Sequence, residues 1–167
     1  MAADALGTLA TIAGTRLKAA GELLVAAESC TGGWIGQAAT AIAGSSEWFE
    51  RGFVTYSNAA KQEMLGVREA TIAAYGAVSE ETAREMAAGA LKHSRGTISI
   101  AVTGVAGPSG GTSAKPVGTV CFAWARGGQV RAETRCFEGD RESVRRQSVI
   151  RALQGVIEWL DEGPPRV

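Results

Sequence analysis

Residues 23–33 read LLVAAESCTGG, and the predicted architecture follows from the way this segment changes from apolar to glycine-rich. Residues 23–27 are an unbroken apolar run, which is typical of a β-strand buried on both faces. Residues 28–33 supply a turn, and apolar side chains then recur at helical intervals from Trp34 until Gly44. A buried strand that leads directly into a helix indicates an α/β protein.

The same patterns assign the rest of the chain to helices and strands. Helical periodicity predicts further helices at residues 3–20 and 59–65, after a cap at Ser79 and after a cap at Asp140. Apolar and β-branched runs predict strands at residues 53–56, 97–102, 117–125 and 130–137. The last two strands are expected to form an antiparallel hairpin through Gly127-Gly128.

This order of elements predicts a three-layer α/β/α sandwich around a mixed sheet of about five strands. No Pro-rich, Gly-rich or highly charged linker divides the chain. We therefore expect a single domain that spans residues 1–167, a length sufficient to bury a core without disulfides or metals.

The charge balance limits the kinds of partner. Seventeen basic side chains match seventeen acidic ones, so there is no net field that would hold a nucleic acid or an anionic membrane. A small anionic ligand in one cleft stays compatible with this balance. No apolar run has the length of a membrane helix, and the first charged residues are not in the order of a secretory signal. We expect a cytoplasmic protein that acts on a small-molecule substrate.

Cysteine and histidine are scarce. Cys30, Cys121 and Cys136 are odd in number and form no CxxC pair, which favours a reducing compartment over a disulfide framework. His93 is the only histidine, and the cysteines lie far apart in the sequence. A metal site is therefore not expected.

Ser29 is the candidate nucleophile. It lies where the buried strand gives way to a helix, which is where α/β proteins present reactive groups. Thr31, Gly32 and Gly33 follow it, and backbone N–H groups at this helix N-terminus would stabilise an oxyanion. The local pattern also fits a simpler interpretation, in which Ser29 or Thr31 caps the helix and the glycines form the turn.

A serine nucleophile needs a base, and His93 is expected on the outer part of a helix. Lys61 is the candidate base, because with Asn58 as N-cap it occupies the third helical position, where the helix dipole disfavours its charge and lowers its pKa, and burial would lower the pKa further. Tyr56, at the preceding strand end, is placed to hydrogen-bond Lys61 and relay a proton. The spacing also fits a solvated surface lysine and a half-buried strand tyrosine.

A glycine-rich loop at residues 103–115 follows another buried strand. Its backbone can approach a ligand closely and donate N–H groups to phosphate or ribose oxygens. It matches neither GxGxxG nor the P-loop, and a long surface connection is the alternative interpretation. The candidate ligand-binding residues here are Thr103, Gly104, Ala106, Gly107, Gly111 and Lys115.

Several ordered blocks together resemble the CinA C-terminal domain family. They are AESCTGG (27–33), GSS (44–46), VTYSN (54–58) with Lys61, GAVSE (76–80), TGVAGP (103–108) and KPVGTV (115–120). The resemblance runs from about Leu6 to Leu160 and is to the stand-alone members, without the ADP-ribose-hydrolysing domain of larger CinA proteins. It implies nicotinamide-nucleotide amidase activity, in which nicotinamide mononucleotide and water give nicotinate mononucleotide and ammonia in NAD salvage.

The resemblance also implies functional residues. It implies Ser29, Tyr56 and Lys61 as the catalytic group, places Asn58 and the glycine-rich loop near the nucleotide, and implies neither a metal nor a cofactor. The chain departs from the family at Ala59-Ala60 and Ala114, where many members carry glutamate.

Two alternatives differ from this activity. One is a non-catalytic module that binds a pyridine nucleotide in a competence or DNA-damage response, and the other is an amidase or nucleotide hydrolase with a different substrate. If the protein is an enzyme, we expect it to form a homo-oligomer, as is common for α/β enzymes of this size.

Overall fold

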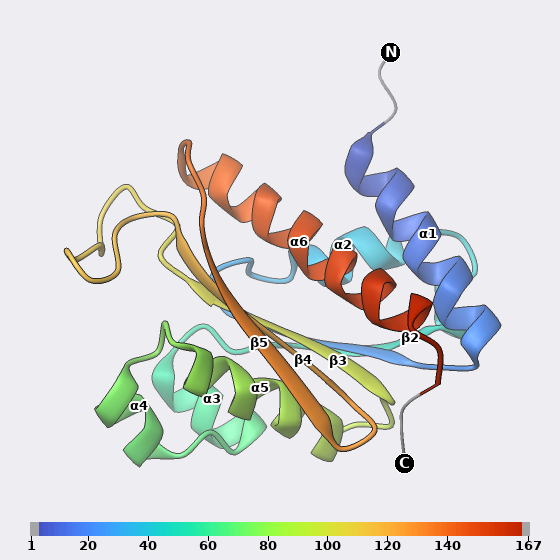
Figure 1. Ribbon diagram of the computed structural model, residues 1–167, viewed down its shortest axis with the longest axis horizontal. Helices are drawn as coiled ribbons and strands as arrows, with labels where there is room; N and C mark the ends of the chain where they lie inside the picture. The colour runs from blue at the N-terminus through green and yellow to red at the C-terminus, as the bar shows by residue number, and fades with distance from the viewer. Residues whose placement is uncertain (1–3, 165–167) are drawn as a thin grey trace.

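A mixed sheet of five strands lies between two layers of helices in the computed structural model, which describes residues 4–164 (Figure 1). The strand order is β2-β1-β3-β4-β5. Strand β1 pairs in parallel with β2 and β3, whereas β4 is antiparallel to β3 and β5. The predicted three-layer α/β/α architecture is confirmed.

The bounds of the elements define where the functional loops begin. The strands are β1 (Leu24–Glu28), β2 (Phe49–Val54), β3 (Ile98–Gly104), β4 (Thr119–Arg126) and β5 (Gln129–Cys136). The helices are α1 (Ala5–Ala20), α2 (Trp34–Thr40), the 3₁₀ turn η1 (Ser45–Glu47), α3 (Asn58–Leu65), α4 (Glu69–Tyr75), α5 (Glu80–Lys92) and α6 (Arg141–Asp161).

The two faces of the sheet have different cores. Helices α1, α2 and α6 cover one face, and α3, α4 and α5 lie on the other (Figure 1). Large side chains such as Leu17 and Phe122 fill the first core. The core beneath α5 consists largely of alanines, including Ala87 and Ala123, so α5 approaches the sheet closely. Alternating residues of β1 enter the two cores in turn, as Ala26 and Ala27 do, which explains its unbroken apolar sequence.

One predicted strand was misplaced, and one helix was missed. Strand β2 runs from Phe49 to Val54, not over residues 53–56, because its edge position leaves it half exposed and without an apolar run. Helix α4 is short and has no side-chain cap, so it lacked a sequence signal. The first residue of the helix predicted at 3–20 lies outside the described residues, and Asp4 caps the helix observed there.

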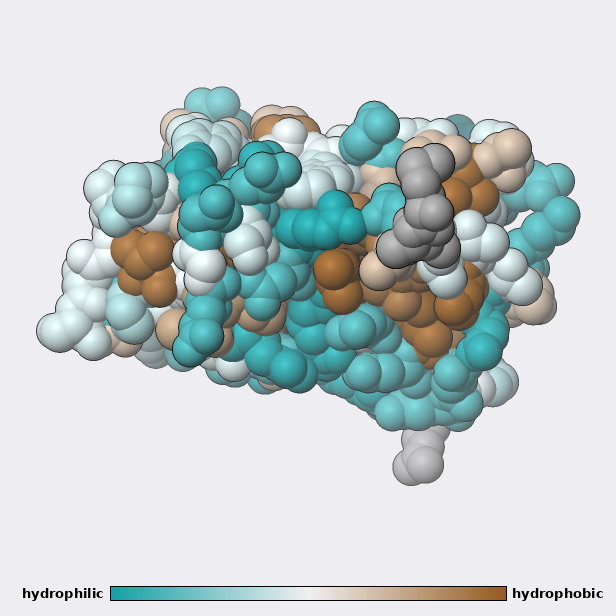
Figure 2. Space-filling model, turned by 90° about the horizontal axis from the view of Figure 1, so that it is seen from above, coloured by the Kyte–Doolittle hydropathy of each residue, from teal (hydrophilic) through white to brown (hydrophobic). Residues whose placement is uncertain are grey.

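The surface carries its balanced charges as local pairs. Lys18 contacts Glu47 at 2.7 Å, and Arg146 contacts Asp4 at 2.6 Å. Most of the face seen from above is hydrophilic, with apolar side chains gathered mainly in one region (Figure 2). Among residues 4–164, no helix combines the length and apolar character needed to cross a membrane.

Helix α3, which carries Lys61, packs tightly on α5 at Gly89. A Cβ at this position would overlap the Leu65 carbonyl oxygen, which is backbone and has no free rotation to relieve the overlap. We expect Gly89→Ala to lower the free energy of unfolding by about 1–3 kcal/mol. Gly7→Ala is the matched control, because its Cβ would meet nothing closer than 3.6 Å in α1, and we expect a gain of about 0.5–1 kcal/mol.

Urea unfolding followed by circular dichroism measures both variants. Equal stabilities for Gly89→Ala and the unmodified protein would contradict the close approach of α3 and α5.

Candidate active site

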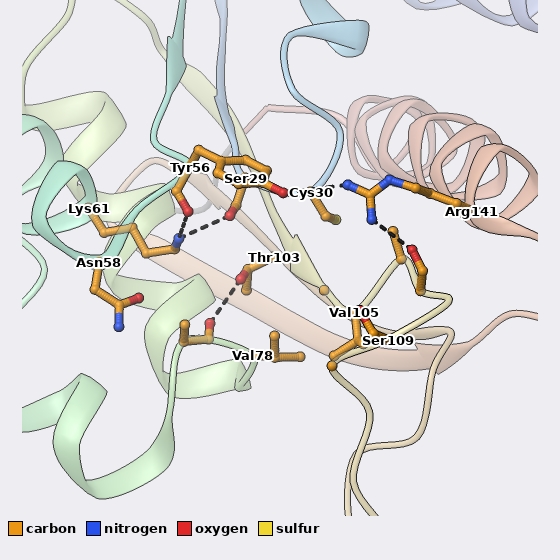
Figure 3. Close-up of a pocket in the computed structure, with 15 residues that line it drawn as sticks. Ser29, Cys30, Tyr56, Asn58, Lys61, Val78, Thr103, Val105, Ser109 and Arg141 are labelled. Carbon is orange, nitrogen blue, oxygen red and sulfur yellow. Dashed lines mark hydrogen bonds between the residues drawn. The ribbon is translucent and has the colours of Figure 1, made fainter.

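A cavity of about 370 Å³ opens where the parallel strands β1, β2 and β3 end, which is the usual ligand site of α/β sheets (Figure 3). Its lining residues come from these strand ends, from α3, from the loop before α5, from the glycine-rich loop and from α6. They are Ser29, Cys30, Tyr56, Asn58, Lys61, Ala77, Val78, Thr103, Gly104, Val105, Ala106, Gly107, Ser109, Gly110 and Arg141. Among residues 4–164, no group of three or more His, Cys, Asp or Glu side chains is arranged to hold a metal ion.

The turn after β1 is built around the carboxylate of Glu28, which is 1% exposed. This carboxylate accepts hydrogen bonds from the Thr31 hydroxyl at 2.7 Å, the Ile35 amide at 2.8 Å and the Gly36 amide at 3.1 Å. Glu28 therefore satisfies the N-terminal amides of α2, and neither Ser29 nor Thr31 acts as its cap. Ser29 is left free to face the cavity.

Arg145 of α6 holds the same turn from the other side. Its guanidinium donates to the Cys30 carbonyl at 3.0 Å and to the Thr31 carbonyl at 3.0 Å, and lies 5.4 Å from the Trp34 ring centroid. No local sequence pattern indicates this contact, because more than a hundred residues separate Arg145 from the turn.

Lys61 and Ser29 meet inside the protein. The Lys61 Nζ atom lies 2.9 Å from Ser29 Oγ, 3.0 Å from the Thr55 carbonyl oxygen and 3.3 Å from the Tyr56 carbonyl oxygen. Only 1% of Lys61 is exposed, and this burial lowers its pKa from the ordinary value. The surface-lysine interpretation is excluded.

Of the two causes expected for the lowered Lys61 pKa, the helix dipole and burial, burial is the leading one. Ser57, not Asn58, caps α3 by accepting from the Ala60 amide, so Lys61 is the fourth helical residue and lies beyond the expected third position.

The expected hydrogen bond between the Tyr56 hydroxyl and Lys61 is absent. Tyr56 reaches Lys61 only through its backbone carbonyl, and its side chain is 65% exposed with the hydroxyl 3.4 Å from a guanidinium nitrogen of Arg141. The Tyr56 side chain is directed toward Arg141 and away from Lys61 (Figure 3).

Cys30 is a second potential nucleophile in the cavity lining. Burial raises the pKa of its thiol to about 12. The thiolate is the reactive form of cysteine, and at neutral pH this thiol is protonated. Ser29 is therefore the better candidate for nucleophile.

The predicted ligand-binding residues fall into two groups. Those that line the cavity are Asn58, Thr103, Gly104, Ala106 and Gly107. Those that do not line it are Thr31, Gly32, Gly33, Gly111 and Lys115.

Two residues of the second group, Gly32 and Lys115, form hydrogen bonds with backbone carbonyls elsewhere. The Gly32 amide donates to the Ser29 carbonyl at 3.0 Å, so this predicted oxyanion donor is already occupied. The Lys115 ammonium donates to the Tyr75 carbonyl at 2.7 Å, beside a neighbouring cavity. Sequence reasoning also missed Arg141 and Ser109, which do line the site.

Comparisons with known proteins identify the family of this chain. The profile of the CinA C-terminal domain matches residues 6–160. Nicotinamide-nucleotide amidohydrolase PncC of Escherichia coli K12 is 56% identical over 142 residues, which cover 84% of this chain and 86% of that protein. The PncC protein of Pseudomonas putida is 52% identical over 155 residues, 93% of this chain and 97% of that protein.

Solved structures agree with the fold. A CinA superfamily protein from Klebsiella pneumoniae superposes with a TM-score of 0.92 at 40% identity, covering 95% of this chain and 99% of that one. A competence/damage inducible protein from Agrobacterium tumefaciens has a TM-score of 0.90 at 45% identity, covering 96% and 98% of the two chains. With the family profile matching most of its length and relatives of 52–56% identity, the chain belongs to the CinA C-terminal domain family.

Proposed function

We propose that this protein hydrolyses the carboxamide of nicotinamide mononucleotide to nicotinate mononucleotide and ammonia. The observation that carries the proposal is the 2.9 Å contact between Ser29 Oγ and the buried Lys61 Nζ inside a ligand-sized cavity. The choice of substrate is supported by relatives of 52–56% identity that are named nicotinamide-nucleotide amidohydrolase.

The three contacts of Lys61 Nζ match the three N–H groups of an ammonium, and a neutral amine, which the proposed reaction requires, also fits them. Such an amine has two N–H donors, which match the carbonyl oxygens of Thr55 and Tyr56, and one lone pair, which then faces the Ser29 hydroxyl. Burial favours this uncharged form. Lys61 is therefore the general base of the proposed reaction.

The proposed reaction has two steps, acylation of Ser29 and hydrolysis of the acyl-serine ester. Ser29 Oγ attacks the carboxamide carbon while its proton passes to Lys61 Nζ, and the tetrahedral adduct collapses as Lys61 returns that proton to the leaving nitrogen, which departs as ammonia. A water molecule then attacks the acyl-serine ester with Lys61 again as base. Nicotinate mononucleotide leaves, and the Ser29 hydroxyl is restored.

The Tyr56 hydroxyl takes no part in this proton transfer. We expect Tyr56→Phe to keep kcat within about threefold, because the variant retains the backbone carbonyl that faces Lys61 and loses only a hydroxyl that points toward Arg141. Steady-state kinetics on nicotinamide mononucleotide measure this. A fall in kcat of about 10²-fold or more would instead support the proton relay.

Direct detection of both products tests the proposal. The purified protein is incubated with nicotinamide mononucleotide, and ammonia and nicotinate mononucleotide are quantified together, with nicotinamide and nicotinamide riboside as parallel substrates. Stoichiometric release of the two products supports the amidase. Thermal stabilisation by the nucleotide without ammonia would identify the non-catalytic binding module, and ammonia from another amide alone would identify a different amidase.

A cytoplasmic location and a homo-oligomeric state complete the proposal. Cys30, Cys121 and Cys136 are free thiols, as is usual in reducing compartments. Small enzymes commonly assemble with closed symmetry, and light scattering of the purified protein measures its state.

A further inference from the structure

The cavity has a second cationic side chain opposite the reactive pair. Arg141, the first residue of α6, enters the cavity from the side away from Lys61, with Ser29 and Cys30 between them (Figure 3). The reactive end is therefore separated from a second, polar end that the proposed chemistry does not use.

The cavity lining carries positive charge only. Lys61 and Arg141 are its basic residues, and no aspartate or glutamate is among the lining residues. Lys61 is buried against Ser29, so Arg141 is the cation that a ligand can reach. A cavity of this composition favours an anionic ligand.

Arg141 is held in place without being neutralised. Its guanidinium donates to the Gly107 carbonyl at 2.7 Å and lies 3.4 Å from the Tyr56 hydroxyl, and both partners are neutral. Within residues 4–164 no carboxylate forms an ion pair with Arg141, whereas Arg146 and Arg151 on the same helix are paired with Asp4 and Glu133. A guanidinium has five N–H donors, so several remain for a ligand.

The glycine-rich loop adds neutral donors beside this cation. Ser109 and Gly110 line the cavity next to Gly107, and the positive φ angles of Gly107 and Gly110, 84° and 92°, give this segment the tight backbone that lets a ligand approach closely. Hydroxyl and backbone N–H groups around one guanidinium are a common setting for a phosphate group.

We propose that Arg141, assisted by Ser109, binds the phosphate of the substrate and makes the site specific for 5′-phosphorylated ribosides over the corresponding nucleosides. This inference rests on the proposed function for the reacting amide, but its chemistry is that of the opposite end of the cavity. It assigns a specificity-determining role to a residue outside the Ser29–Lys61 pair.

Calorimetry with ribose 5-phosphate tests phosphate binding by Arg141 separately from catalysis. We expect this probe to bind the unmodified protein, to bind Arg141→Gln at least about tenfold more weakly, and to bind Arg146→Gln unchanged. Arg146 is the matched control because it lies on the same helix but pairs with Asp4 outside the cavity. No binding to the unmodified protein, or equal binding to Arg141→Gln, would overturn the assignment.

Kinetics provide the second readout. In Arg141→Gln we expect kcat/KM for nicotinamide mononucleotide to fall about 10- to 100-fold, mostly through KM, and kcat/KM for nicotinamide riboside to stay within about twofold. Equal losses of kcat/KM for both substrates would place Arg141 at the reacting end of the cavity and refute its proposed role in phosphate binding. If the unmodified protein releases no ammonia, the proposed function fails, and the calorimetry still decides the role of Arg141.

Discussion

Replacement of Ser29 by alanine is expected to lower kcat for nicotinamide mononucleotide by about 10⁴- to 10⁶-fold, the scale of losing a nucleophile that forms a covalent intermediate. The variant is expected to keep its fold, because Lys61 is the hydrogen-bond partner of the Ser29 hydroxyl among residues 4–164, and the turn is held by Glu28 and Arg145. Ammonia release measures the loss, and circular dichroism verifies the fold.

Two further measurements make the Ser29 result specific. Ser46→Ala, an exposed serine outside the cavity, is the matched control and is expected to retain full activity. Rapid acid quench followed by mass spectrometry is expected to show an acyl group on Ser29 of the unmodified protein. A folded Ser29→Ala variant with more than about a tenth of the normal kcat would exclude Ser29 as nucleophile.

Replacement of Lys61 by alanine has the second-largest expected effect, a fall in kcat/KM of about 10²- to 10⁴-fold through loss of the general base. The pH profile tests the cause. Burial lowers the pKa of Lys61, so the neutral amine becomes populated below the ordinary lysine range. In the unmodified protein kcat/KM therefore rises as pH increases through this lowered pKa, and Lys61→Ala loses that rise.

The Lys61→Arg variant separates proton transfer from positive charge. Arginine keeps the charge but is not deprotonated in proteins, so we expect it to be as inactive as alanine. Lys18→Ala, which removes a surface lysine paired with Glu47, serves as the control for charge loss and is expected to have normal activity. Substantial activity in Lys61→Arg would show that Lys61 acts as a cation and not as a base.

The fold was largely predictable because the buried central strands have recognisably apolar sequences. Strand β1 is covered by helices on both faces, so its apolar run is unbroken, and β4 is likewise fully buried. Strand β2 is at the edge of the sheet and half exposed, so its pattern is weak and its position was misjudged.

The site was predictable only where local sequence determines it. Ser29 follows directly from the strand–turn–helix pattern, whereas the meeting of Ser29 with Lys61 depends on the parallel pairing of β1 and β2. The direction of the Tyr56 side chain is set by tertiary packing and was not predictable. Arg141 and Arg145 reach the site from the opposite end of the sequence, and no short-range pattern indicates such contacts.

The support that Arg145 gives to the Ser29 turn has a consequence for biosynthesis. Helix α6 is the last element of the domain to leave the ribosome, so a growing chain contains Ser29 and Lys61 well before it contains the guanidinium that fixes the turn. Until then the Cys30 and Thr31 carbonyls lack that partner. Arg145 therefore joins the Ser29 turn only after α6 has been synthesised.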